Sequence, residues 1–513
     1  MIGAEVWRSF YQDSVALMRL AESLRALDGV EEAAALMGTP ANMEILAQAG
    51  LATAETATAT PGDLVLAVRA TGETAVRAAL ARARELLTER RRAPAAAGRP
   101  APRTLDAALR ELPEANVAMI SVPGAYAALE AKRALLRGLH VFLFSDNVPL
   151  ADEIELKRLA RRKRLLCMGP DCGTAYLAGV PLGFANVVPR GRVGLVAASG
   201  TGLQAVACHL AALGEGVSHG IGVGGRDLSA EVGGAMTTLA LEALGADSST
   251  SLVVVISKPP APEALPALED AVTRVGKPVV VCCLGAAAPP GTHARWVGTL
   301  ADAAPAAVAG LRGETWTPRP FGDAAAVRAR LAAHAAGARG RSVLGLYTGG
   351  TLAHEATLLL EPLLGRAVHG PGAGGDAAPR IIDLGDDEFT RGRPHPMIDP
   401  GARAARVREA GRDREVGVLL LDLVLGRAAH PDPAGPLAAA VAEARRAAHA
   451  DGRSLVAVAS VVGTAADPQG LDGQVKTLLA AGIEVLPTNA EAARFAAAVA
   501  RPDLAPRILG DRP

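Results

Sequence analysis

Small and hydroxyl-bearing residues are concentrated in the turn Ser199-Gly200-Thr201-Gly202, where an apolar run gives way to a helical pattern. Such a turn has three possible roles: a cradle for a phosphate, a nucleophilic serine, or a plain corner between strand and helix. It is not a nucleophile elbow, because Ala197 stands where the first glycine of G-x-S-x-G belongs, and no Gly-Lys-Ser/Thr follows as a Walker A loop requires. Free N–H groups at the start of a helix favour an anion, so the cradle and the plain corner remain.

Three further corners place a charged residue after an apolar run. Lys258 in "SKPPAPEA" presents an ammonium group beside two prolines that fix the backbone, and Arg226 in "VGGRDL" is available to an anionic group. Asp171 in "MGPDCGT" is either a polar ligand contact or a turn former. For Lys258 the alternative is a solvated side chain beside a proline turn.

The segment "DLGDDEFTRGRPHPMIDP" at residues 383–400 combines many charges with few apolar residues. An ordered loop of this kind often binds something, although a solvated charge run is the alternative. Another glycine corner, Gly426-Arg427, follows a long apolar run. The charged residues of the segment are Asp386, Asp387, Arg391, Arg393, His395 and Asp399.

Composition excludes several classes of protein. The 53 basic residues balance the 53 acidic residues, and aromatic residues make up only 3%, so we expect no nucleic-acid partner. No apolar run approaches the length of a membrane span, and the first residues lack a signal-peptide pattern, so a cytoplasmic protein is expected. The five cysteines fit neither a metal knuckle nor a disulfide framework, so we expect buried thiols and no metal site.

The segments that could position these corners alternate regularly between expected strands and expected helices. Strands that are apolar throughout alternate with amphipathic helices, which predicts an α/β fold with parallel sheets covered on both faces. A small N-terminal α/β domain precedes three such units, and ligands collect at the carboxyl ends of their strands. The expected parts are a domain at 1–87, a linker at 88–103, units at 104–187 and 188–310, a linker at 311–340 and a unit at 341–513.

These motifs in this order resemble the nucleotide-diphosphate-forming acyl-CoA synthetases, and more closely the FdrA family. "MGPDCGT", "RVGLVAASGTG", "GIGVGGRDL" and "GKPVVVCCLG" are similar to the α-subunit of succinyl-CoA synthetase. "LYTGGTLAHEA", "IIDLGDD" and "LLLDLVLGR" are similar to the carboxyl-terminal domain of its β-subunit. "YQDSVALM", "LMGTPAN", "FSDNVPLADEIELK" and "GRPHPMIDP" are FdrA-type signatures.

The resemblance implies a CoA-binding-like Rossmann domain at 104–187 and ligase-like flavodoxin domains at 188–310 and 341–513. It also implies that the turn at residues 199–201 and the corner at Gly426 begin two helices whose N-termini face each other across a phosphoryl site. The ligase's phosphohistidine motif G-H-A-G is absent, and His293 in "PPGTHARW" has different neighbours. The ligase's G-E-I-G-G is replaced by "SKPP", and no ATP-grasp domain is present. A complete ligase cycle is therefore not expected from this chain alone.

The resemblance to FdrA implies a subunit of a hetero-oligomer that exchanges oxalurate plus phosphate for oxamate plus carbamoyl phosphate in purine ureide catabolism. Phosphate or carbamoyl phosphate is then a substrate, and no cofactor is required. One alternative is an NDP-forming acyl-CoA synthetase that uses coenzyme A, ATP or GTP, and a separate ATP-grasp subunit to phosphorylate His293. The other is a non-catalytic scaffold that senses an anion.

In the carbamoyl-transfer hypothesis each candidate residue has a role. The backbone at Ser199, Gly200, Thr201 and Gly426, together with Arg427, holds phosphate. The three expected catalytic residues neutralise charge or meet the substrate carboxylate, and they are Lys258, Arg226 and His395. The remaining expected contacts with the small-molecule substrate are Asp171, Asp386, Asp387, Arg391 and Arg393.

Overall fold

The computed structural model describes residues 1–10, 12, 14–92, 102–334, 342–365, 367–369, 378–390 and 394–510. The chain divides into two compact units, residues 1–103 with 387–395 and residues 104–386 with 396–513, and each is described by itself. Within the described ranges, no helix combines the length and the apolar character needed to cross a bilayer. The predicted α/β class, with a small N-terminal domain and parallel sheets, is confirmed.

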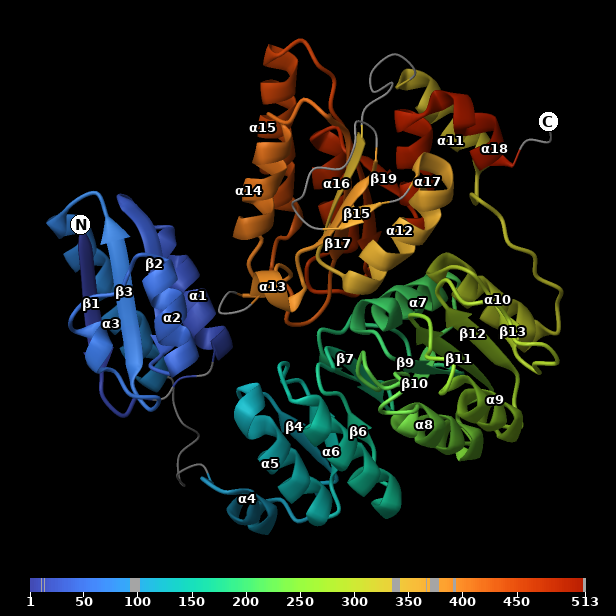
Figure 1. Cartoon of the computed structure of the whole chain (residues 1–513), viewed down its shortest axis with the longest axis horizontal. Helices are drawn as coiled ribbons and strands as arrows, with labels where there is room; N and C mark the ends of the chain where they lie inside the picture. The colour runs from blue at the N-terminus through green and yellow to red at the C-terminus, as the bar shows by residue number, and fades with distance from the viewer. Residues whose placement is uncertain are drawn as a thin grey trace. The chain divides into compact units, whose positions relative to one another are not determined.

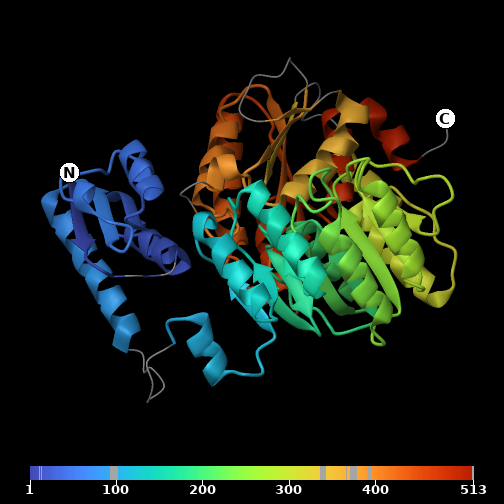
Figure 2. The ribbon, with the colours of Figure 1, turned by 60° about the horizontal axis from the view of Figure 1, so that its bottom comes forward.

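The N-terminal domain is a three-stranded antiparallel sheet in the order β1-β3-β2. Helices α1 and α3 pack on one face of this sheet and α2 covers the other, as the blue part of Figure 2 shows. Its elements are β1 Ile2–Trp7, α1 Ser14–Arg25, β2 Val30–Met37, α2 Pro40–Gln48, β3 Leu64–Ala70 and α3 Glu73–Arg92. The linker expected from residue 88 therefore begins later, because Glu and Arg are strong helix formers and continue α3.

The next sheet is small and parallel, in the order β4-β5-β6. Its strands alternate with helices as predicted from the sequence. The elements are α4 Leu105–Glu111, β4 Val117–Ile120, α5 Gly124–Leu136, β5 His140–Leu143, α6 Leu150–Lys163 and β6 Cys167–Met168.

A seven-stranded sheet follows, in the order β13-β12-β11-β9-β10-β7-β8. Strands β9 to β13 are parallel, whereas β7 and β8 form an antiparallel hairpin on the edge of β10. The sheet therefore begins before the boundary expected at residue 187. Its elements are β7 Thr174–Leu177, β8 Val180–Gly183, β9 Val193–Ala197, α7 Gly200–Ala212, β10 Val217–Gly222, α8 Ala235–Ala246, β11 Leu252–Ser257, α9 Leu265–Arg274, β12 Val279–Cys283, β13 Arg295–Trp296 and α10 Leu300–Arg312.

The last sheet is six-stranded and parallel, in the order β15-β16-β14-β17-β18-β19. Helix α11 Ala324–Ala333 precedes it, inside the segment expected to be a linker. The remaining elements are β14 Ser342–Tyr347, α12 Gly350–Leu364, β15 Val368–His369, β16 Arg380–Asp383, α13 Asp387–Thr390, α14 Gly401–Ala410, β17 Val416–Val424, α15 Ala434–Ala450, β18 Val456–Val462, α16 Leu471–Ala480, β19 Glu484–Leu486, α17 Asn489–Ala500 and α18 Ala505–Leu509.

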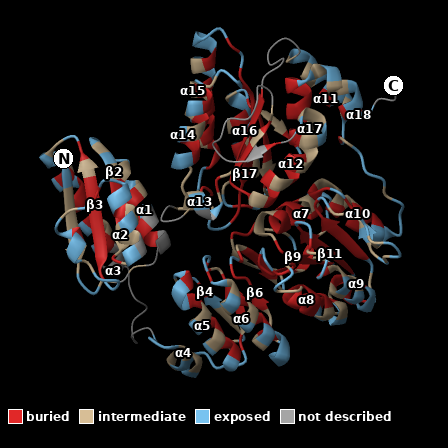
Figure 3. Cartoon of the chain, in the orientation of Figure 1, coloured by how far each residue is buried: buried red, intermediate tan, exposed pale blue. Residues whose placement is uncertain are grey.

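The two large sheets repeat one topology. In each, the first parallel strand in sequence lies between two strands that come later in the chain, β9 between β10 and β11 and β14 between β16 and β17. Such a reversal of strand order is where open α/β sheets bind ligands. One buried apolar cluster includes residues of both sheets and of α7, α10, α12 and α17, and the central strands are buried (Figure 3). The two sheets therefore share a core that holds their strand ends in place.

Candidate functional site

Helices α7 and α12 begin beside each other, each directly after the first parallel strand of its sheet (Figure 1). The hydroxyl oxygens of Ser199 and Thr351 are 2.5 Å apart and share a hydrogen bond. On the opposite diagonal, a Cβ atom added to Gly349 would lie only 2.9 Å from Cγ2 of Thr201. Each corner therefore contacts the other reciprocally, its first residue against the third residue of its counterpart.

The α7 corner is shaped by the N-cap of its helix. Ser199 has extended backbone angles, and its Oγ accepts a hydrogen bond from the Gly202 amide at 2.9 Å. Serine is a preferred N-cap because this bond satisfies one amide of the first turn. Within the described residues, the structure assigns no acceptor to the amides of Gly200 and Thr201. These two amides, at the positive end of the helix dipole, are available to an anion.

A buried carboxylate holds the backbone at the start of α12 in place. Asp422, in the middle of the sheet on β17, accepts hydrogen bonds from the Thr348 amide and the Gly349 amide, both at 2.9 Å, and from the Thr348 hydroxyl at 3.0 Å. Arg403 pairs with the same carboxylate at 3.1 Å, and both side chains are buried. Gly349 is the N-cap and has no side chain to bond the first turn, and its lack of a side chain leaves room for Thr201 of α7.

Asp383 brings a carboxyl group to this corner from the end of β16. Its Oδ1 accepts a hydrogen bond from the Gly385 amide at 2.9 Å. Its Oδ2 lies so near the start of α12 that a Cβ added to Gly350 would come within 2.4 Å of it. Burial is the main cause that raises the pKa of Asp383 to about 6. The charge of Lys258 acts in the opposite direction on this pKa.

Lys258 belongs to the seven-stranded sheet, and its charge acts on Asp383 of the six-stranded sheet. It follows β11, at the point where strand order reverses in the seven-stranded sheet, and its side chain is exposed. Its electrostatic effect on Asp383 indicates that the two strand ends face one region. The structure thus brings the predicted residues Ser199, Thr201 and Lys258 to the same part of the molecule.

The sequence predicted that Gly426 begins the helix that faces the Ser199 corner, and this prediction was wrong. The amide of Gly426 donates to Oε1 of Gln469 at 3.1 Å, and a Cβ added to Gly426 would lie 2.7 Å from the Ala185 carbonyl oxygen. The Arg427 amide donates to the same carbonyl at 2.8 Å, and its side chain is exposed. The physical reason is that α15 begins only at Ala434, so no helix starts at Gly426.

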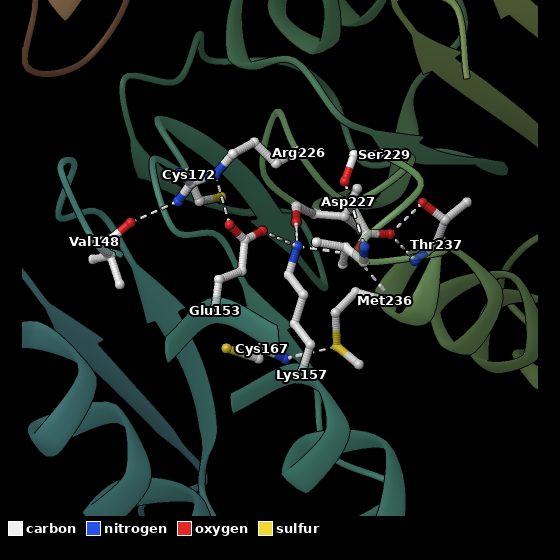
Figure 4. A network of polar contacts seen from close by, with 12 residues as sticks. Val148, Glu153, Lys157, Cys167, Cys172, Arg226, Asp227, Ser229, Met236 and Thr237 are labelled. Atoms are coloured by element: carbon white, nitrogen blue, oxygen red, sulfur yellow. Dashed lines mark hydrogen bonds and ion pairs between the residues drawn. The ribbon is translucent and has the colours of Figure 1, made fainter. Parts of the chain in front are cut away.

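Arg226 lies in an ion pair rather than open to a ligand. Its Nε is 2.7 Å from Oε2 of Glu153, and its Nη2 donates to the Val148 carbonyl at 2.8 Å. Figure 4 shows Lys157 between the carboxylates of Glu153 and Asp227, at 2.7 and 2.9 Å. This cluster joins α6 to the loop after β10. Because Glu153 already balances its charge, Arg226 is poorly placed for the predicted neutralisation of a substrate.

Three residues that the sequence analysis named lie on the surface of the larger unit: Asp171, Asp386 and His293. Asp171 has an exposed side chain and a positive φ of 54°, and its amide donates to the Ser145 carbonyl at 3.0 Å. Its turn-forming role is therefore visible. Asp386 is exposed three residues after the end of β16, and its charge also raises the pKa of Asp383, but less than burial and Asp422 do. His293 is exposed in the loop before β13.

Residues 387–395 of the charged segment belong to the other compact unit. Burial lowers the pKa of His395 to about 4, which favours its neutral form at neutral pH. Asp387 begins the short helix α13, and its side chain is outside the described atoms. Arg391 and Arg393 lie outside the described residues. Their predicted roles stay predictions.

Sequence reasoning missed four residues that build the α12 corner: Gly349, Thr351, Asp383 and Asp422. A signal was present, because "TGGT" follows an apolar strand and begins a helical pattern just as "SGTG" does. The acidic residue that closes the strand "RIID" was a second signal, since strand ends in parallel sheets carry ligand contacts.

Comparison with known proteins places this architecture in a class. Residues 346–499 match a family model described as CoA-ligase. The scaffold is therefore CoA-ligase-like and related to the NDP-forming acyl-CoA synthetases. The chain is also 38% identical over 488 residues to the uncharacterised protein YahF of Escherichia coli K12, covering 92% of this chain and 93% of that protein. This chain belongs to the family of YahF.

The chain is also similar to more distant proteins. The chain is 28% identical over 202 residues to subunit alpha 2 of an ADP-forming succinate–CoA ligase from Archaeoglobus fulgidus, which covers 38% of this chain and 67% of that subunit. A solved dinucleotide-forming acetyl-coenzyme A synthetase from Ca. Korarchaeum cryptofilum, in complex with phosphate and ADP, aligns with a TM-score of 0.33 and 17% identity. That alignment covers 77% of this chain and 84% of the other.

Residues 1–102 match a model described as "AllF, heavy metal-associated domain". The residues present do not fit a soft metal ion, because this segment contains neither cysteine nor histidine. Across the part of the chain that the structure describes, no group of three or more His, Cys, Asp or Glu side chains could hold a metal.

Proposed function

We propose that this chain is a subunit of a group-transfer enzyme that handles an acyl phosphate between the starts of α7 and α12. The observation that carries the proposal is the hydrogen bond between Ser199 and Thr351, which holds two helix N-termini of one chain together. Two helix dipoles that point at one place stabilise a phosphate or an acyl phosphate. Lys258 adds a positive charge near the same strand ends.

The acyl group that we propose is carbamoyl, transferred between oxalurate and phosphate. This choice is supported by the resemblance of the chain to FdrA-type proteins. A phosphate oxygen attacks the ureido carbon of oxalurate, the bond from that carbon to the oxamate nitrogen breaks, and the nitrogen takes a proton. The products are carbamoyl phosphate and oxamate. The amides of Gly200 and Thr201 would bind the phosphate, and Lys258 would offset its charge.

Direct transfer of this kind needs no phosphohistidine. The one histidine near the position of the ligase motif, His293, is exposed and lies in a loop before β13. The resemblance to FdrA-type proteins supports other subunits of a hetero-oligomer that would complete the enzyme. Phosphate and carbamoyl phosphate are then the substrates, with no bound cofactor.

The test is phosphorolysis. The chain, purified with the subunits encoded beside it, is incubated with oxalurate and inorganic phosphate, and carbamoyl phosphate is measured. We expect product that depends on phosphate and falls when Thr201 and Lys258 are replaced by alanine. Absence of carbamoyl phosphate with every subunit present would overturn the proposal.

The match to the CoA-ligase model favours a second candidate, an NDP-forming acyl-CoA synthetase that works with a separate ATP-grasp subunit. In that case ATP or GTP would place an acid-labile phosphate on His293, and coenzyme A would be the acceptor. Incubation with labelled ATP and the ATP-grasp subunit separates the candidates, because the carbamoyltransferase takes up no phosphate. Loss of the label in His293→Ala would assign it to that residue.

A further inference from the structure

Asp383 places an acidic group in a corner that otherwise offers hydrogen-bond donors. Its Oδ2 lies against the start of α12, near enough that a Cβ on Gly350 would collide with it. Its Oδ1 is held by the Gly385 amide, so the carboxyl group has a fixed direction. An anion bound at the α12 N-terminus would therefore lie beside this carboxyl group.

The charges around Asp383 come from three directions. Asp422 on β17 acts from within the sheet, and Arg403 on α14 is paired with it. Lys258 faces Asp383 from the end of β11, and Asp386 lies on the same loop. Burial dominates these effects and raises the pKa of Asp383 to about 6. An ionised Asp383 would repel a phosphate, whereas a protonated Asp383 could donate a hydrogen bond to it.

We propose that Asp383 is the proton carrier of this site: it takes up a proton when an anion binds and gives that proton to the leaving nitrogen of the substrate. The second half rests on the proposed function. In that step the carboxyl proton moves to the oxamate nitrogen as its bond to the carbamoyl carbon breaks. The proton of the attacking phosphate restores the acid, so atoms and charge balance.

The first half is tested on the chain alone with sulfate, which stays a dianion across the working range of pH. If a proton binds with the anion, linkage requires the dissociation constant to rise with pH above the pKa of the carrier, by up to about tenfold per pH unit. We therefore expect sulfate affinity to fall by about tenfold or more between pH 6 and pH 8. In Asp383→Asn the affinity should be the same at both values and at least as high as that of the wild type at pH 8.

A matched control is Asp472→Asn. Asp472 is an exposed carboxylate in the first turn of α16, so it also lies near a helix N-terminus but away from this corner. This variant should keep the pH dependence of the wild type. Sulfate binding that is independent of pH in the wild type, or equally pH-dependent in Asp383→Asn, would overturn the proposal.

The second half is tested in the complete hetero-oligomer with oxalurate and phosphate. Asp383→Asn should lower kcat by about a hundredfold, the usual size of a general acid contribution, while KM for phosphate stays the same or falls. Unchanged kcat with a working wild type would refute the proton transfer and leave the proposed function intact. If the wild-type complex makes no carbamoyl phosphate, the proposed function fails, and the sulfate titration still decides whether Asp383 carries a proton. A thermal melt of the variant checks that it is folded.

Discussion

The hydroxyl groups of Ser199 and Thr351 share a hydrogen bond although 152 residues separate them in the chain. Ser199 is the N-cap of α7 and Thr351 lies in the first turn of α12, and each helix follows the first parallel strand of its sheet. The bond therefore couples the two corners directly rather than through the core behind them.

This coupling can be measured with Ser199→Ala, Thr351→Ala and the double variant. Loss of Thr351 Oγ1 should cost about 1 kcal/mol of the free energy of unfolding, as a typical hydrogen bond does. Ser199→Ala should cost more, because it also removes the N-cap bond to Gly202, worth about 1 kcal/mol. In urea titrations, the free energy of unfolding lost by the double variant should be smaller than the sum of the two single losses, by at least about 0.5 kcal/mol. Simple additivity would show that the hydroxyls do not interact.

Gly349 should not tolerate a side chain. A Cβ there would lie 2.9 Å from Cγ2 and 3.0 Å from Oγ1 of Thr201, so Gly349→Ala should push the helix starts apart and cost about 1 to 3 kcal/mol. Combining it with Thr201→Ser, which removes Cγ2, should recover part of the loss. Gly473→Ala is the matched control, because nothing lies within 4 Å of that position inside α16. That variant should be stabilised by up to about 1 kcal/mol in the same denaturation assay.

Lys157 should be needed for folding of the larger unit. Its ammonium group is buried and bonds Glu153, Asp227 and the Val223 carbonyl. Lys157→Met leaves the buried carboxylate of Asp227 without its cation and Glu153 with Arg226 alone, which should cost about 3 to 5 kcal/mol. The exposed pair of Lys132 and Glu155 provides the comparison, since Lys132→Met should cost less than about 1 kcal/mol. Similar urea midpoints for the two variants would contradict this prediction.

His209 should make the fold less stable in acid. Burial lowers its pKa from 6.5 to about 4, so the folded state favours the neutral ring. Between these two values the unfolded chain binds a proton that the folded chain does not, and the free energy of unfolding therefore falls as pH decreases. His209→Gln should flatten this dependence, measured by urea titrations from pH 4 to pH 7. A slope as steep in His209→Gln as in the wild type would contradict this prediction.

The strand and helix rhythm was readable from the sequence because it depends on local patterns. The corner at Ser199 was found in this way, since a strand, small residues and a helix follow one another within a few positions. The N-terminal boundary was less accurate, because the charged run that ends α3 has strong helix propensity and was taken for a linker.

The pairing of corners could not be read in the same way, because it depends on contacts between distant segments. Gly426 looked like a helix start, but α15 begins at Ala434 and Gln469 binds the Gly426 amide. Arg226 looked available, but Glu153 on a preceding helix holds it. The protonation of Asp383 depends on burial and on charges from other strands, which no local pattern contains.

In this chain the two large sheets belong to one polypeptide. A contact between separate subunits weakens on dilution, whereas a contact within one chain has an effective concentration set by the connecting segment. The bond between Ser199 and Thr351 is of the second kind. The two helix starts consequently meet in a single chain at any protein concentration.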